Sequence, residues 1–276
     1  MKISCLPVSL YSDIINDRIR IGQWAGEAKQ IGYDGIDISV MLLKNRTPAY
    51  LNKLTYEIDS IDMPIVMIMS YPDFTHPDPV QRAREFDYLV SDIALASQLN
   101  IKYLRIVAGQ AHPEMQIKEG TRLVIDNFKK IAPVSEKYGV TLLYENHSKP
   151  GAWDYMDFSF PLDIFLEICD GIRDTGIKLN FDVGNIVACG KDPFDIIPNV
   201  FDMVETIHIS DIKRAGEFSP TIIGQGVVPN EQFIHYLNNN GFDGWLSIEE
   251  ASGNGIDGVK TAYNYVKRIL DDIRIV

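Results

Sequence analysis

The chain has 276 residues, of which 46% are hydrophobic and 23% are charged, as in globular proteins that bury a sizeable core. Its formal charge of -12 argues against a nucleic-acid partner, because such binding depends on Lys and Arg side chains that neutralise phosphates. The absence of a long apolar run, of a signal peptide and of any Cys-x-x-Cys pair predicts a cytoplasmic protein that does not enter a membrane.

Eight apolar runs bounded by turn residues are predicted to be β-strands, at roughly 2–9, 35–40, 63–70, 102–108, 140–146, 177–182, 204–209 and 244–249. Segments with helical periodicity lie between most of them, at 19–30, 48–58, 80–99, 116–138, 162–169, 230–239 and 258–273, with a weaker candidate at 193–199. This alternation predicts an α/β protein with a closed (β/α)8 TIM barrel. No linker divides the chain, so we expect a single domain over residues 1–276.

Polar side chains end each of the last four predicted strands. Three of them are the carboxylates Glu145, Asp182 and Glu249, and the fourth is the imidazole of His208. In a parallel barrel these strand ends meet at one mouth, where catalytic residues lie. Each residue alone is better explained as a helix cap or a packed core residue. Burying three carboxylates together, however, is costly unless a cation lies among them.

The composition of this group indicates which cation it would bind. Three carboxylates and one imidazole form an oxygen-rich set, which favours Mn²⁺, Mg²⁺ or Co²⁺, with Zn²⁺ as a further possibility. His147 shares a strand face with Glu145 and would either orient a ligand or only pack. Arg105, at the end of the fourth strand, would contact substrate or pair with the acids. The sequence Gly224-Gln225-Gly226 would bind a phosphate or form a turn.

The motifs GVTLLYENH, LNFDVGN, IHISD and GWLSIEE, in this order and spacing, resemble the xylose-isomerase-like TIM barrels. This superfamily contains sugar isomerases and sugar or sugar-phosphate epimerases. The likeness extends over nearly the whole chain, including GYDGIDI in the second strand and IGQGVV after the seventh. It implies one divalent metal held by four ligands, which fall on Glu145, Asp182, His208 and Glu249.

The resemblance also implies a reaction. A small sugar, ketose or sugar phosphate would be isomerised or epimerised through a metal-stabilised cis-enediolate, with Glu145 and Glu249 as the acid/base pair on opposite faces. Arg214 lies where such epimerases have a cationic substrate anchor, and Lys213 competes for that role. Related barrels often pair, which implies a homodimer or homotetramer. The remaining predicted substrate contacts are Asn185, His147 and Arg105.

Two further functions use the same scaffold. Dehydroshikimate and inosose dehydratases also resemble this pattern, and they expel water instead of returning the proton; RIVAGQ at 105–110 has a slight likeness to the dehydroshikimate enzymes. A barrel that only binds a sugar is the third alternative, although a binder does not need two carboxylates flanking one metal. Nuclease activity is not expected, because Asn185 replaces a His ligand of the related apurinic endonucleases.

Overall fold

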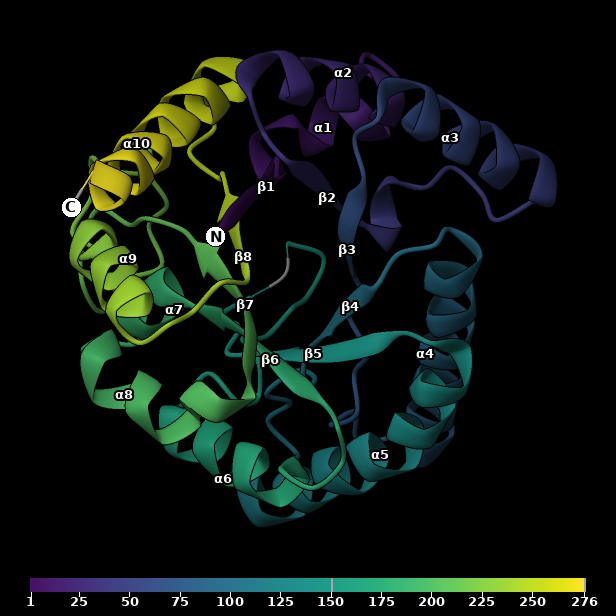
Figure 1. The fold of residues 1–276 in the computed structure, drawn as a ribbon. Coiled ribbons are helices and arrows are strands. Elements are labelled where there is room, and N and C mark those ends of the chain that lie inside the picture. Colours follow the sequence, from purple (N-terminus) through teal and green to yellow (C-terminus); the bar gives the residue numbers. More distant parts are fainter. Residues whose placement is uncertain (150, 276) are drawn as a thin grey trace.

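The computed structural model of the chain describes residues 1–149 and 151–275. Eight parallel strands form a closed barrel in sequence order, and helices surround it (Figure 1). The predicted (β/α)8 TIM barrel is therefore confirmed. The strands are β1 (Lys2–Leu6), β2 (Gly35–Ser39), β3 (Ile65–Met69), β4 (Tyr103–Ile106), β5 (Thr141–Glu145), β6 (Lys178–Asp182), β7 (Val204–Ile209) and β8 (Trp245–Glu249).

The helices follow the predicted segments, and they start and stop at recognisable residues. Thr47 and Asp78 accept hydrogen bonds from the first turns of their helices, each of which has a Pro at its start. Gly32 and Gly139 end two others with φ of 117° and 69°, a left-handed conformation that favours glycine. The helices are α2 (Ile21–Ile31), α3 (Pro48–Ile61), α4 (Pro79–Gln98), α5 (Ile117–Tyr138), α6 (Leu162–Ile172), α8 (Pro193–Val200), α9 (Asn230–Asn239) and α10 (Gly255–Ile275).

Two short helices were not predicted: α1 (Tyr11–Ile15) after β1, and α7 (Val183–Ala188) after β6. With 5 and 6 residues, they are too short to show a helical period in the sequence. Among the described residues, no helix has both the length and the apolar character that crossing a membrane requires.

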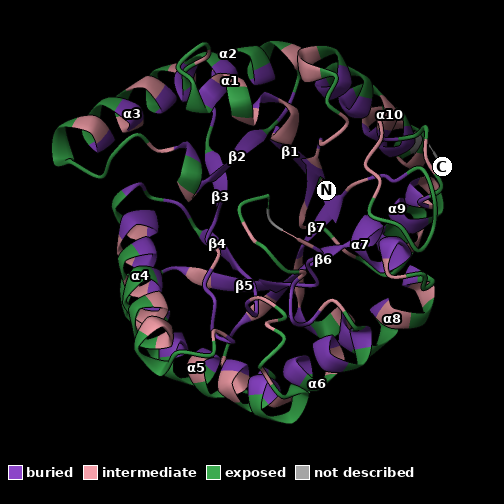
Figure 2. Cartoon of the chain, turned by 180° about the vertical axis from the view of Figure 1, so that it is seen from behind, coloured by how far each residue is buried: buried purple, intermediate pink, exposed green. Residues whose placement is uncertain are grey.

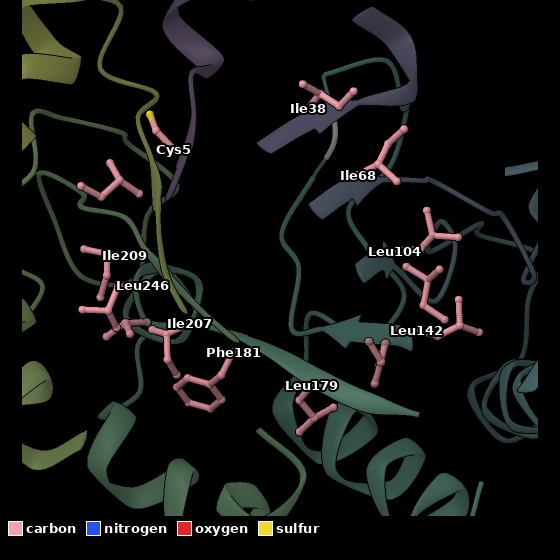
Figure 3. Close-up of a cluster of buried hydrophobic side chains, with 14 of the residues drawn as sticks. Cys5, Ile38, Ile68, Leu104, Leu142, Leu179, Phe181, Ile207, Ile209 and Leu246 are labelled. Atoms are coloured by element: carbon pink, nitrogen blue, oxygen red, sulfur yellow. The ribbon is translucent and has the colours of Figure 1, made fainter. Parts of the chain in front are cut away.

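The apolar core has two layers. The larger layer lies between the outer faces of the strands and the inner faces of the helices, whose outer faces are exposed (Figure 2). Figure 3 shows part of this layer, with Leu179 and Phe181 of β6 side by side on the helix-facing side of the strand. A smaller cluster contains Met67, Met69 and Leu143. Because side chains alternate along a strand, the buried polar residues of β6 to β8 lie on the opposite face from this outer layer.

The strands are staggered around the barrel. Glu145 pairs with Asn180, whereas Asp182, two residues further along β6, pairs with His208 on β7. His208 in turn pairs with Ser247, two residues before the end of β8. This stagger brings the ends of β5 to β8 to one mouth of the barrel.

Candidate metal centre

The side chains at the ends of β5 to β8 converge in the barrel mouth. One ligand atom from each of Glu145, Asp182, His208 and Glu249 lies within 4.8 Å of the others. His208 Nδ1 lies 2.9 Å from Glu145 Oε1, 3.1 Å from Glu249 Oε2 and 3.8 Å from Asp182 Oδ2. The four residues, called the tetrad below, therefore arrange three carboxylates around one imidazole nitrogen.

Asp182 is fixed by hydrogen bonds from three neighbouring segments. Its Oδ1 accepts from the backbone N–H of Asn185 at 2.7 Å and from Ser210 Oγ at 2.9 Å. The Asn146 amide donates to the Asp182 carbonyl at 2.7 Å and accepts from the Asp182 N–H at 2.9 Å, which ties β5 to β6. Sequence reasoning missed these roles of Asn146 and Ser210, although Asn146 lies inside the ENH motif that marks the end of β5.

Arg105 pairs with the tetrad, which is one of the two roles that the sequence left open. Its Nε lies 2.7 Å from Glu145 Oε2, and both side chains are almost fully buried. The guanidinium also lies over the ring of Tyr71, 4.6 Å from the ring centre. Because the other Glu145 oxygen faces His208, both oxygens of this carboxylate are engaged.

Burial and neighbouring charges shift the pKa of each tetrad residue. Burial raises the pKa of Asp182 well above its usual value, and the carboxylates of Glu249 and Glu145 raise it further. Burial also acts to raise the pKa of Glu145, but the charges of Arg105 and His208 outweigh it and hold this pKa below its usual value. At Glu249 the hydrogen bond and charge of His208 outweigh burial and lower the pKa to about 2.

The same contacts act in reverse on the imidazole. Burial lowers the pKa of His208, but Glu145 and Glu249 outweigh it and raise this pKa well above its usual value. The carboxylates therefore favour a positive charge at their centre. Asp182 Oδ2 points toward this centre, and it is buried without a hydrogen-bond partner among residues 1–149 and 151–275. Three carboxylates, one imidazole and an unpartnered oxygen fit a divalent cation.

A cavity of about 50 Å³ lies next to the tetrad, at the ends of β5 to β8. The loop after β5 lies over the middle of the barrel in both views (Figures 1 and 2). Glu249 and Asp182 line the cavity. The Glu249 side chain is 20% exposed, whereas that of Glu145 is fully buried. Glu249 is therefore the glutamate of the tetrad that faces the cavity.

The structure brings two of the other predicted residues to this cavity. His147 and Asn185 both line it. Burial, with a smaller contribution from the charge of Arg105, lowers the pKa of His147 to about 4, although the carboxylate of Glu145 opposes this. His147 therefore faces the cavity as a neutral imidazole at neutral pH.

Lys213 and Arg214, by contrast, are exposed and do not line the cavity. The Lys213 N–H donates to the Ser219 carbonyl at 2.8 Å, which folds this loop back on itself. Arg214 Nη1 lies 3.6 Å from Glu217 Oε2, in an exposed ion pair. The role of either residue as a substrate anchor stays a prediction, and this placement does not favour it.

The Gly224-Gln225-Gly226 segment forms a turn around a carboxylate, one of the two roles that the sequence allowed. The N–H groups of Gly224 and Gly226 donate to Asp211 Oδ2 at 2.9 and 3.0 Å. Asp211 Oδ1 accepts from the N–H groups of Ile212 and Val228 at 2.9 and 3.1 Å. The two glycine amides therefore donate to Asp211 rather than to a phosphate.

A family model described as xylose isomerase-like TIM barrel matches residues 25–269. The chain belongs to this family. Two curated relatives of this xylose isomerase-like barrel are an inosose dehydratase from Clostridium beijerinckii and a putative hydroxypyruvate isomerase from Streptomyces coelicolor. The first is 23% identical over 54% of this chain and 55% of the relative, and the second is 27% identical over 57% and 56%. The matches thus span about half of the length of these relatives.

Solved structures with the same fold include a D-tagatose 3-epimerase-like protein, with a TM-score of 0.79 and 16% identity over 99% of this chain and 98% of that one. A probable 3-DHS dehydratase from Bacillus anthracis has a TM-score of 0.77 and 17% identity, over 97% and 99%. The IOLI protein, which was solved with a zinc atom, has a TM-score of 0.76 and 16% identity, over 99% of each chain. At these identities the likeness shows the fold alone.

Proposed function

We propose that this xylose isomerase-like barrel is a divalent-metal-dependent enzyme that removes a proton from the carbon beside a carbonyl of a small carbohydrate-like substrate. Return of that proton makes it a sugar isomerase or epimerase. The supporting observation is the tetrad, whose four ligand atoms lie within 4.8 Å beside a cavity in the barrel mouth. Isomerases, epimerases and dehydratases all occur by name among the similar proteins.

The cation would be held by the four tetrad residues, with Mn²⁺, Mg²⁺ or Co²⁺ favoured and Zn²⁺ as the alternative. When bound, it polarises the substrate carbonyl and so makes the neighbouring carbon more acidic. Glu249 faces the cavity and is ionised at neutral pH, so it can accept the proton. For an epimerase, Glu145 would be the second acid/base group, on the opposite face of the substrate.

A dehydratase is the second candidate, and the contacts of Glu145 favour it. Both oxygens of this carboxylate are engaged, by Arg105 and by His208, and the residue does not line the cavity. Glu249 and the neutral His147 both do. In loss of water from the carbon next to the acidified one, Glu249 would take the proton from carbon and give it to the departing hydroxyl, which leaves as water, while the neutral His147 would donate a hydrogen bond to that hydroxyl.

Deuterium incorporation tests the proposal. The metal-loaded protein is incubated in heavy water with ketoses, ketose phosphates, inososes and dehydroshikimate. An isomerase or epimerase returns substrate and product that carry deuterium, whereas a dehydratase forms a conjugated product that absorbs in the near ultraviolet. Glu249→Gln should abolish either signal while metal binding persists with reduced affinity. A loaded protein that binds these compounds but gives neither signal is a binding protein, and the proposal is then wrong.

A further inference from the structure

Lys149 lies in the loop after β5, four residues beyond Glu145, and it is one of the residues that line the cavity beside the tetrad. The side chain is half-buried, and its Nζ donates to the backbone carbonyl of Asp154 at 3.1 Å. Across residues 1–149 and 151–275, Lys149 forms no ion pair with a carboxylate. Its ammonium group can therefore turn to a ligand without breaking a salt bridge.

The charged groups around the cavity pair with one another or with backbone N–H groups rather than with Lys149. The tetrad has three negatively charged carboxylates, and the positively charged guanidinium of Arg105 pairs with one of them, Glu145, at 2.7 Å. A divalent cation and Arg105 together cancel those three negative charges. Asp211 also lines the cavity, but both of its oxygens accept from backbone N–H groups, at 2.9 to 3.1 Å. None of these carboxylates forms an ion pair with the ammonium of Lys149 in the described part of the chain.

We propose that Lys149 binds an anionic group of the substrate, a carboxylate or a phosphate, while the polar remainder of the substrate lies at the tetrad. This inference rests on the proposed function, because it places the reacting part of the same molecule next to Glu249. A charged donor and a charged acceptor in a partly enclosed cavity form a stronger hydrogen bond than neutral groups do. Acidic substrates are then preferred over neutral ketoses and inososes.

The position of Lys149 also separates it from the cations that sequence reasoning favoured. Lys213 and Arg214 lie outside the cavity, and Arg214 already has Glu217 as a partner. Lys149 belongs to the same loop as His147, so an anion held by its ammonium lies beside the tetrad rather than at the outer rim. Its flexible four-carbon chain suits either a planar carboxylate or a tetrahedral phosphate.

Binding of matched probe pairs to the Mg²⁺-loaded protein, measured by calorimetry, tests this inference without turnover. Catechol and 3,4-dihydroxybenzoate share a pair of neighbouring hydroxyls and differ by one carboxylate. Sorbitol and sorbitol 6-phosphate differ by one phosphate. We expect one anionic probe to bind at least about tenfold more tightly than its neutral partner. Which pair shows this preference identifies the anion as carboxylate or phosphate.

Three variants assign the preference to Lys149. Lys149→Gln should remove it by weakening the anionic probe about tenfold, with the neutral probe unchanged. Lys149→Arg, which keeps the charge, should retain it. Lys130→Gln makes the same change in net charge on an exposed position of α5 and should have no effect. Circular dichroism of each variant shows whether it is folded, and Lys149→Met, which also removes the charge, provides the test if Lys149→Gln is not.

The outcomes separate this inference from the proposed function. If neither anion binds more tightly than its neutral partner, or if Lys149→Gln keeps the preference, Lys149 does not bind the substrate anion. If the preference depends on Lys149 but no substrate exchanges deuterium or loses water, the anion site stands and the proposed chemistry is wrong.

Discussion

Glu145 contacts two basic side chains at the site, one at each of its carboxylate oxygens. Arg105 lies 2.7 Å from one of its oxygens and His208 lies 2.9 Å from the other. Because Arg105 is buried as well, the two residues depend on one another: removal of one partner of a buried ion pair leaves the other charge without compensation. Glu145 thus has a role in stability in addition to its predicted role as a ligand.

Glu145→Gln is expected to lower the free energy of unfolding by about 3 kcal/mol, because Arg105 then remains buried without a counter-charge. Urea unfolding measures this loss. The double variant Glu145→Gln, Arg105→Met should recover part of the stability, since it removes the unpaired cation, but it should not recover activity. A single variant as stable as the parent protein would show that Arg105 is compensated elsewhere.

Asp157, in the loop after β5, is expected to make the free energy of unfolding depend on pH. Its Oδ1 accepts from the N–H and the hydroxyl of Ser159, at 2.8 and 2.7 Å. Burial, opposed by these bonds and assisted by the charge of Glu145, raises the pKa of Asp157 to about 7. The folded protein therefore keeps this proton up to about pH 7, whereas the unfolded chain releases it near pH 4. Stability from this group is complete below about pH 4 and is lost as the pH rises to 7.

Asp157→Asn, which cannot ionise, is expected to remove this loss. The difference in free energy of unfolding between the variant and the parent protein should shift in favour of the variant by on the order of 2 to 3 kcal/mol from pH 5 to pH 8. Urea unfolding at the two pH values measures the difference. Asp163→Asn, at an exposed position of α6, is the control and should show no such gain. An equal pH slope for Asp157→Asn and the parent protein would contradict the assignment.

At the scale of secondary structure, Asn146 connects the two strands that carry Glu145 and Asp182. Its side chain makes two hydrogen bonds to the backbone of Asp182, at 2.7 and 2.9 Å, and it is buried. α7 starts at the same point, because Asp182 accepts from the N–H of Asn185. The end of β6 is therefore fixed by Asn146, which follows β5, and by the first turn of α7.

Asn146→Ala is expected to weaken metal binding by about 10- to 100-fold, because the end of β6 is no longer tied to β5. Competition with a chelating dye measures this affinity. Asn127→Ala is the matched control, since Asn127 bonds only within its own helix, to the Leu123 carbonyl at 2.8 Å. Unchanged affinity in Asn146→Ala would mean that β6 keeps its position without this side chain.

The strands and long helices could be predicted because each has an apolar period and recognisable ends. Short α1 and α7 could not, since five or six residues show no period. Convergence of the four strand ends followed from barrel geometry once eight strands were recognised. The position of Lys149 did not, because a loop after a strand has no fixed direction. The same reason explains the exposed placement of Lys213 and Arg214, whose loop folds back through Lys213 and Ser219.

At the scale of the whole molecule, the barrel brings together three of the carboxylates that give the protein its formal charge of -12. Their mutual repulsion opposes folding, and a bound cation offsets it. The single domain over residues 1–276, the cytoplasmic location and the homodimer or homotetramer stay predictions.

Removal of metal with a chelator is expected to lower the melting temperature, and addition of Mn²⁺ or Mg²⁺ should restore it. At a free metal concentration of 100 times Kd, the folded state gains about 2.7 kcal/mol. Differential scanning calorimetry at several metal concentrations measures the shift. Glu249→Gln, which removes one carboxylate, should reduce it. A melting temperature independent of metal in the parent protein would count against a metal at the tetrad.

Side-chain alternation along the strands constrains the metal ligands but not the loops that line the cavity. A one-residue insertion within β6 before Asp182 would turn this side chain from the barrel lumen to the helix layer, because side chains alternate along a strand. Length changes in the loops at 147–157 and 213–220 leave that alternation untouched. Descendants of such a barrel can therefore exchange substrates through loop insertions and deletions, while the length of each strand up to its ligand remains constant.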